Sequence, residues 1–243
     1  MTRRTVLVLA ATTLGCTPRM VLPPTSTGAF LETPHTAAPG EARIDATMSS
    51  LGQLFSAELG AATLGYTRGI GESTELTIAP VFQVYNDGTG RVQNFERKDS
   101  YGYGADLRVK TRPFDSKHFA TFLGLGGLVN HYASIVAPSL GASLAFENDY
   151  FVPFLNAQVY AAAPLLQRDV IITDTADTGT SATPATTKTL HPTTTVGGLA
   201  SAGFQVNIAK VVSLKAALTG GAVHSQTDDL IVLGAALGAG AAF

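Results

Sequence analysis

The sequence predicts an all-β protein, a transmembrane antiparallel up-and-down β-barrel of ten strands, with eight strands as the alternative. Three observations lead to this fold class. Apolar residues alternate with polar or small ones over segments of about ten residues, as tilted transmembrane strands require. No continuous apolar run of about twenty residues, the length of a transmembrane helix, follows the first fifteen residues. Only 14% of residues are charged, against about 25% in average globular domains.

Residues 1–15 form the first element and predict an exported protein. Arg3 and Arg4 make the beginning of the segment positively charged, and residues 5–14 form an apolar stretch too short to cross a bilayer. A small-residue cleavage region then ends at Cys16, the only cysteine of the 243-residue chain. The segment resembles a bacterial lipoprotein signal peptide, which implies that Cys16 is lipidated. The alternative is an ordinary signal peptide with an incidental cysteine.

Residues 16–40 form the second element. They are rich in Pro, Thr and Ala and show no useful periodicity. Such a composition favours an extended linker over a packed element. We therefore expect a tether that lies outside the barrel without a packed core, and a barrel formed by residues 41–243.

The barrel region contains ten segments in which apolar residues alternate with polar or small ones. In the clearest of them, tyrosine, leucine and valine side chains oppose Asp106 and Arg108. The phase of the second segment slips, which predicts a bulge there, and Pro80 is awkward in a paired strand. The predicted strands cover residues 41–49, 56–67, 75–85, 99–112, 118–129, 134–146, 150–161, 194–206, 211–223 and 229–243.

Connector lengths support this assignment independently of the alternation. Outer-membrane barrels have short periplasmic turns and longer external loops. If the amino terminus is periplasmic, every second connector should be short. The connectors expected in the periplasm are indeed short, at residues 69–72, 113–117, 147–149 and 207–210. The two long connectors, residues 87–98 and 164–192, both fall on the external side, and we expect the second to be a mobile loop.

The final segment alternates almost perfectly and ends in an aromatic residue. Ile231, Leu233 and Leu237 share one face with Phe243, and Gly238 lies on the other face. A chain that ends in this way resembles a bacterial outer-membrane β-barrel protein. In that family a terminal aromatic residue and an upstream glycine form the signal that the assembly machinery reads, so the resemblance implies this role for Gly238 and Phe243. It also implies the outer membrane of a Gram-negative bacterium as the location, with membrane lipids and the assembly machinery as partners.

A soluble barrel of the lipocalin kind is the competing fold. Its strands also alternate, but they place the apolar face inward and the polar face in water. In this sequence the polar faces are mostly Gly, Ser, Ala and Thr, which solvate an exterior poorly and suit a crowded lumen. The membrane barrel is therefore favoured.

Charged residues on the predicted inner faces gather toward the periplasmic end of the strands. There are four of each sign, which favours a layer of mutually neutralising ion pairs over an ion-selective constriction. The layer comprises Arg43, Asp45, Glu75, Asp106, Arg108, Lys110, Glu147 and Lys215. Above it the inner faces carry small and uncharged polar residues, which suggests a cup open to the outside rather than a continuous pore. These residues are Thr77, Gln83, Gly102, Gly104, Ser139, Asn156, Gln158, Thr219 and Gly221.

The sequence predicts location and architecture better than activity. The favoured function is a lipid-anchored outer-membrane protein of structural or interaction type, with an envelope or extracellular partner at loops 87–98 and 164–192. The alternatives are a small-solute pore or open cup, and an enzyme of the external rim, either lipid-modifying or a protease. No cofactor, nucleotide or metal signature is present, and a net charge of −2 gives no reason to propose a nucleic acid partner.

Candidates for a rim enzyme lie in two external connectors. His131 and Ser134 belong to the fifth connector, and the ninth contains His224, Ser225, Asp228 and Asp229. Their spacing matches no catalytic or metal-binding arrangement convincingly, and loop residues of these types are most often solvated. We therefore predict no catalytic residue. Convergence of His131 and His224 on a shared acid would favour the enzyme alternative.

Overall fold

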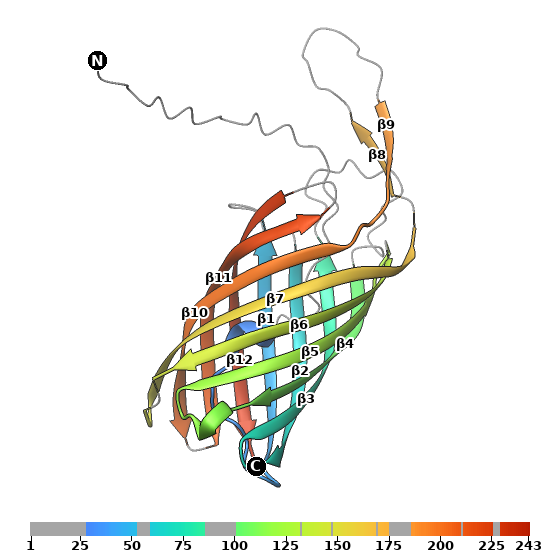
Figure 1. Cartoon of the computed structure of the whole chain (residues 1–243). Coiled ribbons are helices and arrows are strands. Elements are labelled where there is room, and N and C mark those ends of the chain that lie inside the picture. Colours follow the sequence, from blue (N-terminus) through green and yellow to red (C-terminus); the bar gives the residue numbers. More distant parts are fainter. Residues whose placement is uncertain are drawn as a thin grey trace, which may run out of the picture.

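Ten strands close into one antiparallel barrel in the computed structural model (Figure 1). The structure describes residues 28–52, 59–85, 101–131, 133–146, 148–168, 170–174, 186–209, 211–225 and 229–243. The barrel strands are β1 (Ala42–Gly52), β2 (Leu59–Gly71), β3 (Thr74–Tyr85), β4 (Tyr101–Thr111), β5 (Phe119–Val129), β6 (Ala133–Ala145), β7 (Phe151–Gln167), β10 (Thr195–Ala209), β11 (Val212–Ser225) and β12 (Asp229–Ala242). Each pairs with the next barrel strand along the chain, so the predicted ten-stranded up-and-down barrel is confirmed.

Strands β1 and β12 close the barrel. Ile44 on β1 pairs with Ala241 on β12, so the last strand returns to the first. The helical elements in the described part of the chain are two short 3₁₀ turns, η1 (Gly28–Leu31) and η3 (Pro113–Asp115). No helix among the described residues is long and apolar enough to span a membrane.

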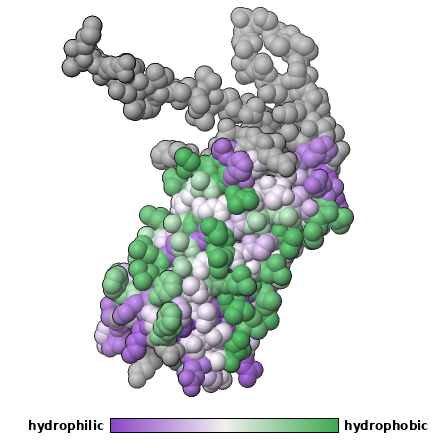
Figure 2. Space-filling model, in the orientation of Figure 1, coloured by the Kyte–Doolittle hydropathy of each residue, from purple (hydrophilic) through white to green (hydrophobic). Residues whose placement is uncertain are grey.

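Side chains of the barrel strands alternate between the outer wall and the lumen. On β4, Tyr103 and Leu107 are exposed whereas Asp106 and Arg108 are buried, as the sequence pattern predicts. Every barrel strand places large apolar side chains on the outer wall. On the face seen in Figure 2, hydrophobic side chains run along the wall between hydrophilic clusters nearer its two ends.

Strand β2 lacks the bulge that its phase slip predicted. Its register with β1 runs unbroken from Leu59 to Arg68, so the prediction was wrong. Leu59 is an apolar residue that faces the lumen, where it is buried. The irregularity of β2 lies instead between Gly69 and Gly71, against β3. Pro80 faces outward, and the β2–β3 ladder has a gap beside it because proline has no amide hydrogen to donate.

Two of the connectors predicted to be short are short. Residues 72–73 join β2 to β3, and residues 112–118, which include η3, join β4 to β5.

The loop expected over residues 164–192 differs from the prediction. Strand β7 continues to Gln167, and β8 (Val170–Asp174) pairs with β9 (Thr186–Leu190) in a separate two-stranded sheet. Loop 87–98 lies outside the described residues.

Residues 28–38 are called the lumen segment below, because residues 30–34, 36 and 37 are buried inside the barrel. In Figure 1 the blue turn η1 sits within the ring of strands. Phe30 and Leu31 are only 3% and 2% exposed, and both belong to the apolar core. The expectation that residues 16–40 stay outside the barrel is therefore wrong for this part, because the lumen gives these two side chains an apolar place to bury. Residues 16–27 lie outside the described residues.

Candidate functional site

The lumen segment is hydrogen-bonded to three strands on one side of the barrel. The carbonyl oxygen of Phe30 accepts hydrogen bonds from Asn156 Nδ2 on β7 at 3.1 Å and from Ser201 Oγ on β10 at 3.0 Å. The carbonyl oxygen of Glu32 accepts a hydrogen bond from Ser143 Oγ on β6, also at 3.0 Å. A chain without regular structure must satisfy its buried backbone groups with side chains. These small polar residues of the wall do so for the segment.

The lumen around and above η1 is packed. The polar residues predicted for an open cup do face inward, and Gln83, Ser139, Asn156, Gln158 and Thr219 are all buried. They share the lumen with apolar side chains that the alternation did not assign to it. With Phe30 and Leu31, these form a core that includes Leu51, Leu59, Val81, Leu128, Ile135, Phe154, Tyr160, Leu199 and Val223.

The charged layer exists, and the structure connects seven of its eight predicted members by ion pairs. Glu147 lies outside the described residues. Arg43 contacts Asp45 at 2.5 Å and Glu75 at 3.5 Å, and Lys215 Nζ lies 3.1 Å from Asp45. The remaining wall pairs are Arg108 with Asp106 at 2.8 Å and Lys110 with Glu75 at 2.7 Å.

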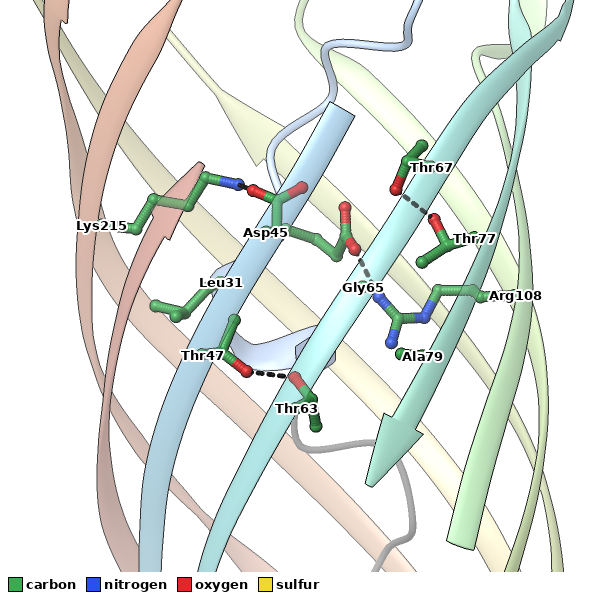
Figure 3. A pocket seen from close by; sticks show the side chains of 11 residues that line it. Leu31, Asp45, Thr47, Thr63, Gly65, Thr67, Thr77, Ala79, Arg108 and Lys215 are labelled. Carbon is green, nitrogen blue, oxygen red and sulfur yellow. Dashed lines mark hydrogen bonds and ion pairs between the residues drawn. The ribbon is translucent and has the colours of Figure 1, made fainter. Parts of the chain in front are cut away.

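Glu32 of the lumen segment is a further member of the layer, and the sequence did not predict it. Its Oε1 is paired with Arg108 Nη1, and its Oε2 lies 3.0 Å from Lys110 Nζ. With Glu32 in place, the described charged layer contains four cations and four carboxylates. Figure 3 shows Lys215 reaching Asp45, with Arg108 on the other side of the cavity.

Lys110 fixes the position of the segment as well as its charge. Its ammonium group donates to the carbonyl oxygens of Thr33 at 3.0 Å and His35 at 2.7 Å. Glu75, on the wall, binds the segment as an acceptor: its carboxylate accepts a hydrogen bond from the backbone amide of Ala37 at 2.7 Å. The network therefore binds the backbone of residues 33–37, not only the carboxyl group of Glu32.

Glu32 is the charged residue of this network that lies outside the barrel strands. Burial opposes its ionisation, but the nearby cations Lys110 and Arg108 outweigh burial and hold its pKa below the ordinary range. Glu32 is therefore an anion at neutral pH. The segment is attached to the wall by charge-assisted hydrogen bonds, the stronger kind.

The segment leaves the lumen past Gly69. Pro39 forms a parallel bridge with Gly69, and the amide of Gly69 donates to the carbonyl oxygen of Glu41 at 3.1 Å. A Cβ on Gly69 would stand 2.1 Å from the carbonyl oxygen of Ala38, closer than any real contact. Gly40 then turns the chain into β1 with φ of +90°, a conformation that favours glycine. Both glycines thus serve the passage from segment to wall.

The two residues assigned to the assembly signal occupy different environments. Phe243 is exposed at the outer wall, and its backbone exchanges hydrogen bonds with Ala42. Gly238 faces the lumen, where a Cβ would stand 2.8 Å from Leu31 Cδ1. Gly238 therefore has a packing role against the lumen segment that the sequence did not reveal. The assembly role of both residues stays a prediction.

A small cavity lies beside Glu32. It is lined by Leu31, Asp45, Arg108, Lys215 and four threonines, and its volume of about 30 Å³ is enough for a water molecule. The threonines are hydrogen-bonded in pairs across neighbouring strands, Thr47 with Thr63 and Thr67 with Thr77 (Figure 3). The cavity is too small for a solute of ordinary size.

The rim candidates do not come together as a catalytic group. His224 Nδ1 lies 2.5 Å from Asp229 Oδ1, but both side chains are more than 70% exposed. His131 follows β5, and strands β7 and β10 separate the β5–β6 pair from the β11–β12 pair in the barrel. Ser225 faces inward and is buried, Ser134 is half-buried on β6, and Asp228 lies outside the described residues.

No protein-family model and no curated protein matches the sequence. Solved structures similar to this chain include the N-terminal β-barrel domain of Pseudomonas aeruginosa OprF, at 14% identity over 84% of this chain and 98% of that chain, with a TM-score of 0.36. The NanC porin covers 81% of this chain and 98% of its own at 7% identity and a TM-score of 0.39. The attachment invasion locus protein Ail of Yersinia pestis covers 84% and 99% at 13% identity and a TM-score of 0.30. Structures with TM-scores this low say nothing about the function of this chain.

Proposed function

We propose that this protein is an outer-membrane β-barrel whose lumen is closed by its own N-terminal segment. It acts as a structural or interaction protein through its wall and its ends, not as a solute pore. The observation that carries this proposal is the insertion of Glu32 between Arg108 and Lys110, with Phe30 and Leu31 packed above it. Together the ion pairs of Glu32 and the apolar packing of Phe30 and Leu31 hold the segment across the lumen and obstruct it.

The outer wall supports a membrane location. Met48 on β1, Tyr103 on β4, Leu123 on β5 and Leu218 on β11 are each more than 60% exposed, and these strands lie on different parts of the barrel. An apolar surface of this extent is unfavourable in water and favourable in hydrocarbon. The buried charges of the lumen exclude the lipocalin arrangement, in which the apolar face is inside. Closure also leaves none of the ten barrel strands with an unpaired edge, as a lipid environment requires.

A lipid anchor at Cys16 is compatible with the position of the lumen segment. Gly28 lies twelve positions after Cys16, and an extended chain of this length reaches about 40 Å. That reach exceeds half the hydrocarbon thickness of a bilayer, about 15 Å. Mass spectrometry of the mature amino terminus tests the anchor, which requires a diacylglyceryl-modified Cys16 as the first residue.

Recognition by the assembly machinery through Phe243, and a partner at loops 87–98 and 164–192, complete the proposal. Phe243 is exposed next to the closing β1–β12 seam, as a residue read by another protein must be. Replacing Phe243 by Ala keeps its two backbone hydrogen bonds with Ala42 and should slow barrel assembly in cells without changing the stability of refolded protein. A change of stability alone would argue against the signal.

The alternative function is a small-solute pore, and planar-bilayer recording separates it from the closed barrel. The wild-type protein, shown to be folded by its heat-modifiable gel mobility, should give no steady ohmic conductance. A variant with Phe30, Leu31 and Glu32 all replaced by Ser should conduct, because it loses the apolar packing and the two ion pairs of Glu32. Steady conductance of the folded wild-type protein would overturn the proposal and establish the pore.

A further inference from the structure

We propose that Arg108 and Lys110 form a carboxylate-binding site in the lumen, which Glu32 occupies in the intact chain and which a small monocarboxylate such as acetate occupies when that side chain is removed. The site rests on the closed lumen proposed above. It is a ligand site built into the wall, and the lumen segment supplies its ligand in cis.

The geometry of the two cations matches a carboxyl group. Arg108 and Lys110 are two residues apart on β4 and therefore point to the same side of the sheet. Arg108 Nη1 pairs with one oxygen of Glu32, and Lys110 Nζ lies 3.0 Å from the other. Two donors on two oxygens fix a planar carboxylate, whereas a monatomic anion cannot bridge them in this way.

The site keeps its form without Glu32 because the wall holds both cations. Asp106 lies 2.8 Å from Arg108 Nη2, and Glu75 lies 2.7 Å from Lys110 Nζ. Both cations are buried, with side-chain exposures of 4% and 2%. The described wall residues of the layer carry four cations, Arg43, Arg108, Lys110 and Lys215, against three carboxylates. Among these described residues one positive charge is left, and Glu32 neutralises it in the intact chain.

Acetate replaces what the substitution Glu32→Ala removes. That substitution deletes two carbons and two oxygens, the same heavy atoms that acetate contains. The cavity of about 30 Å³ beside Glu32 adds some room at the same place. Chloride supplies the charge without the two-oxygen geometry, and phosphate is larger and carries more charge.

The test compares unfolding of the Glu32→Ala barrel in acetate and in chloride at equal ionic strength and pH 7. The unfolding midpoint should rise with acetate in a saturable manner, as expected for a ligand of the folded state, and should respond less to chloride or phosphate. The matched control is Glu72→Ala, the same chemical change at an exposed turn residue. It should show no difference between the two salts. If Glu32→Ala does not stay folded, its refolding yield in the two salts gives the same comparison.

A second variant, Glu32→Ala with Arg108→Met, should lose the acetate response. Equal effects of acetate and chloride on a destabilised Glu32→Ala barrel would refute the carboxylate site and leave the closed lumen intact. If Glu32→Ala matches the wild-type protein in stability and does not respond to acetate, Glu32 is not in the lumen, and the proposed closure fails as well.

Discussion

Replacement of Arg108 by Ala should destabilise the barrel more than any change at its rim. The Arg108 side chain is 4% exposed and pairs with two carboxylates, Asp106 from the wall and Glu32 from the lumen segment. Its guanidinium also lies 5.7 Å from the centre of the Phe122 ring. The substitution therefore removes one partner of each ion pair, while the carboxylates of Asp106 and Glu32 stay buried.

The size of the expected loss of stability follows from the burial of the Arg108 ion pairs. Removing one partner of a buried ion pair costs about 3 to 5 kcal/mol, because the remaining charge keeps its desolvation penalty. Glu32 retains Lys110 at 3.0 Å, so the loss should fall mainly on Asp106. Loss of the contact with Phe122 adds about 0.5 to 1 kcal/mol. We expect the free energy of unfolding to fall by about 3.5 to 6 kcal/mol in total.

Urea unfolding of the barrel in lipid vesicles measures this change. The matched control is His224→Ala, which removes one partner of an ion pair whose side chains are 72% and 84% exposed. Exposed pairs contribute about 0 to 1 kcal/mol, so the control should leave the unfolding midpoint nearly unchanged. Equal small effects of the two substitutions would show that Arg108 is solvated and that the charged layer does not hold the lumen segment.

Three further outcomes are expected. Gly69→Ala should lower stability by about 1 to 3 kcal/mol and speed hydrogen exchange in residues 32–38, because its Cβ would collide with the backbone there, whereas Gly198→Ala, with nothing within 4 Å, should not. Leu123→Arg should cost about 2 to 4 kcal/mol of vesicle folding energy, if this exposed residue faces the bilayer centre, and Phe146→Arg about 0 to 1 near the end of the wall; equal costs would contradict the membrane orientation. The pKa of Glu32 is lowered in the folded barrel. The ionised Glu32 side chain therefore stabilises the barrel at every pH above the ordinary glutamate pKa of about 4.3, and this stabilisation is lost only as the pH falls through the lowered pKa. A conductance that opens between about pH 8 and pH 5 would contradict this account.

The strands and the wall side of the charged layer could be predicted because both depend on a period of two. Alternation assigns Asp106, Arg108 and Lys110 to one face without any knowledge of partners. Where an apolar residue faces inward, the same rule misleads. Leu59 breaks the expected alternation because part of the lumen is an apolar core, which the sequence alone does not show.

The lumen segment could not be predicted from pattern, since irregular backbone has no period. Its place depends on contacts between residues far apart in the chain, such as Phe30 with Asn156 and Ser201. Two signals were present in the sequence. Phe30, Leu31 and Glu32 are two large apolar residues followed by an acid within a Pro- and Thr-rich stretch. The predicted balance of the layer also counted Glu147, whose position is not described, and the structure supplies Glu32 as the fourth described carboxylate.

A disulfide between the lumen segment and the wall tests the central claim most directly. Leu31 Cδ1 lies 2.8 Å from the place where a Cβ on residue 238 would stand, so Leu31→Cys and Gly238→Cys place two thiols in the same part of the lumen. Cys16→Ser removes the competing thiol, and Thr47→Cys with Thr63→Cys, a directly paired position on β1 and β2, is the positive control. Peptide mass spectrometry after mild oxidation of the folded barrel should find the 31–238 disulfide in high yield. If the control pair forms its disulfide and the 31–238 pair does not, the segment does not occupy the lumen and the barrel is not closed by its own chain.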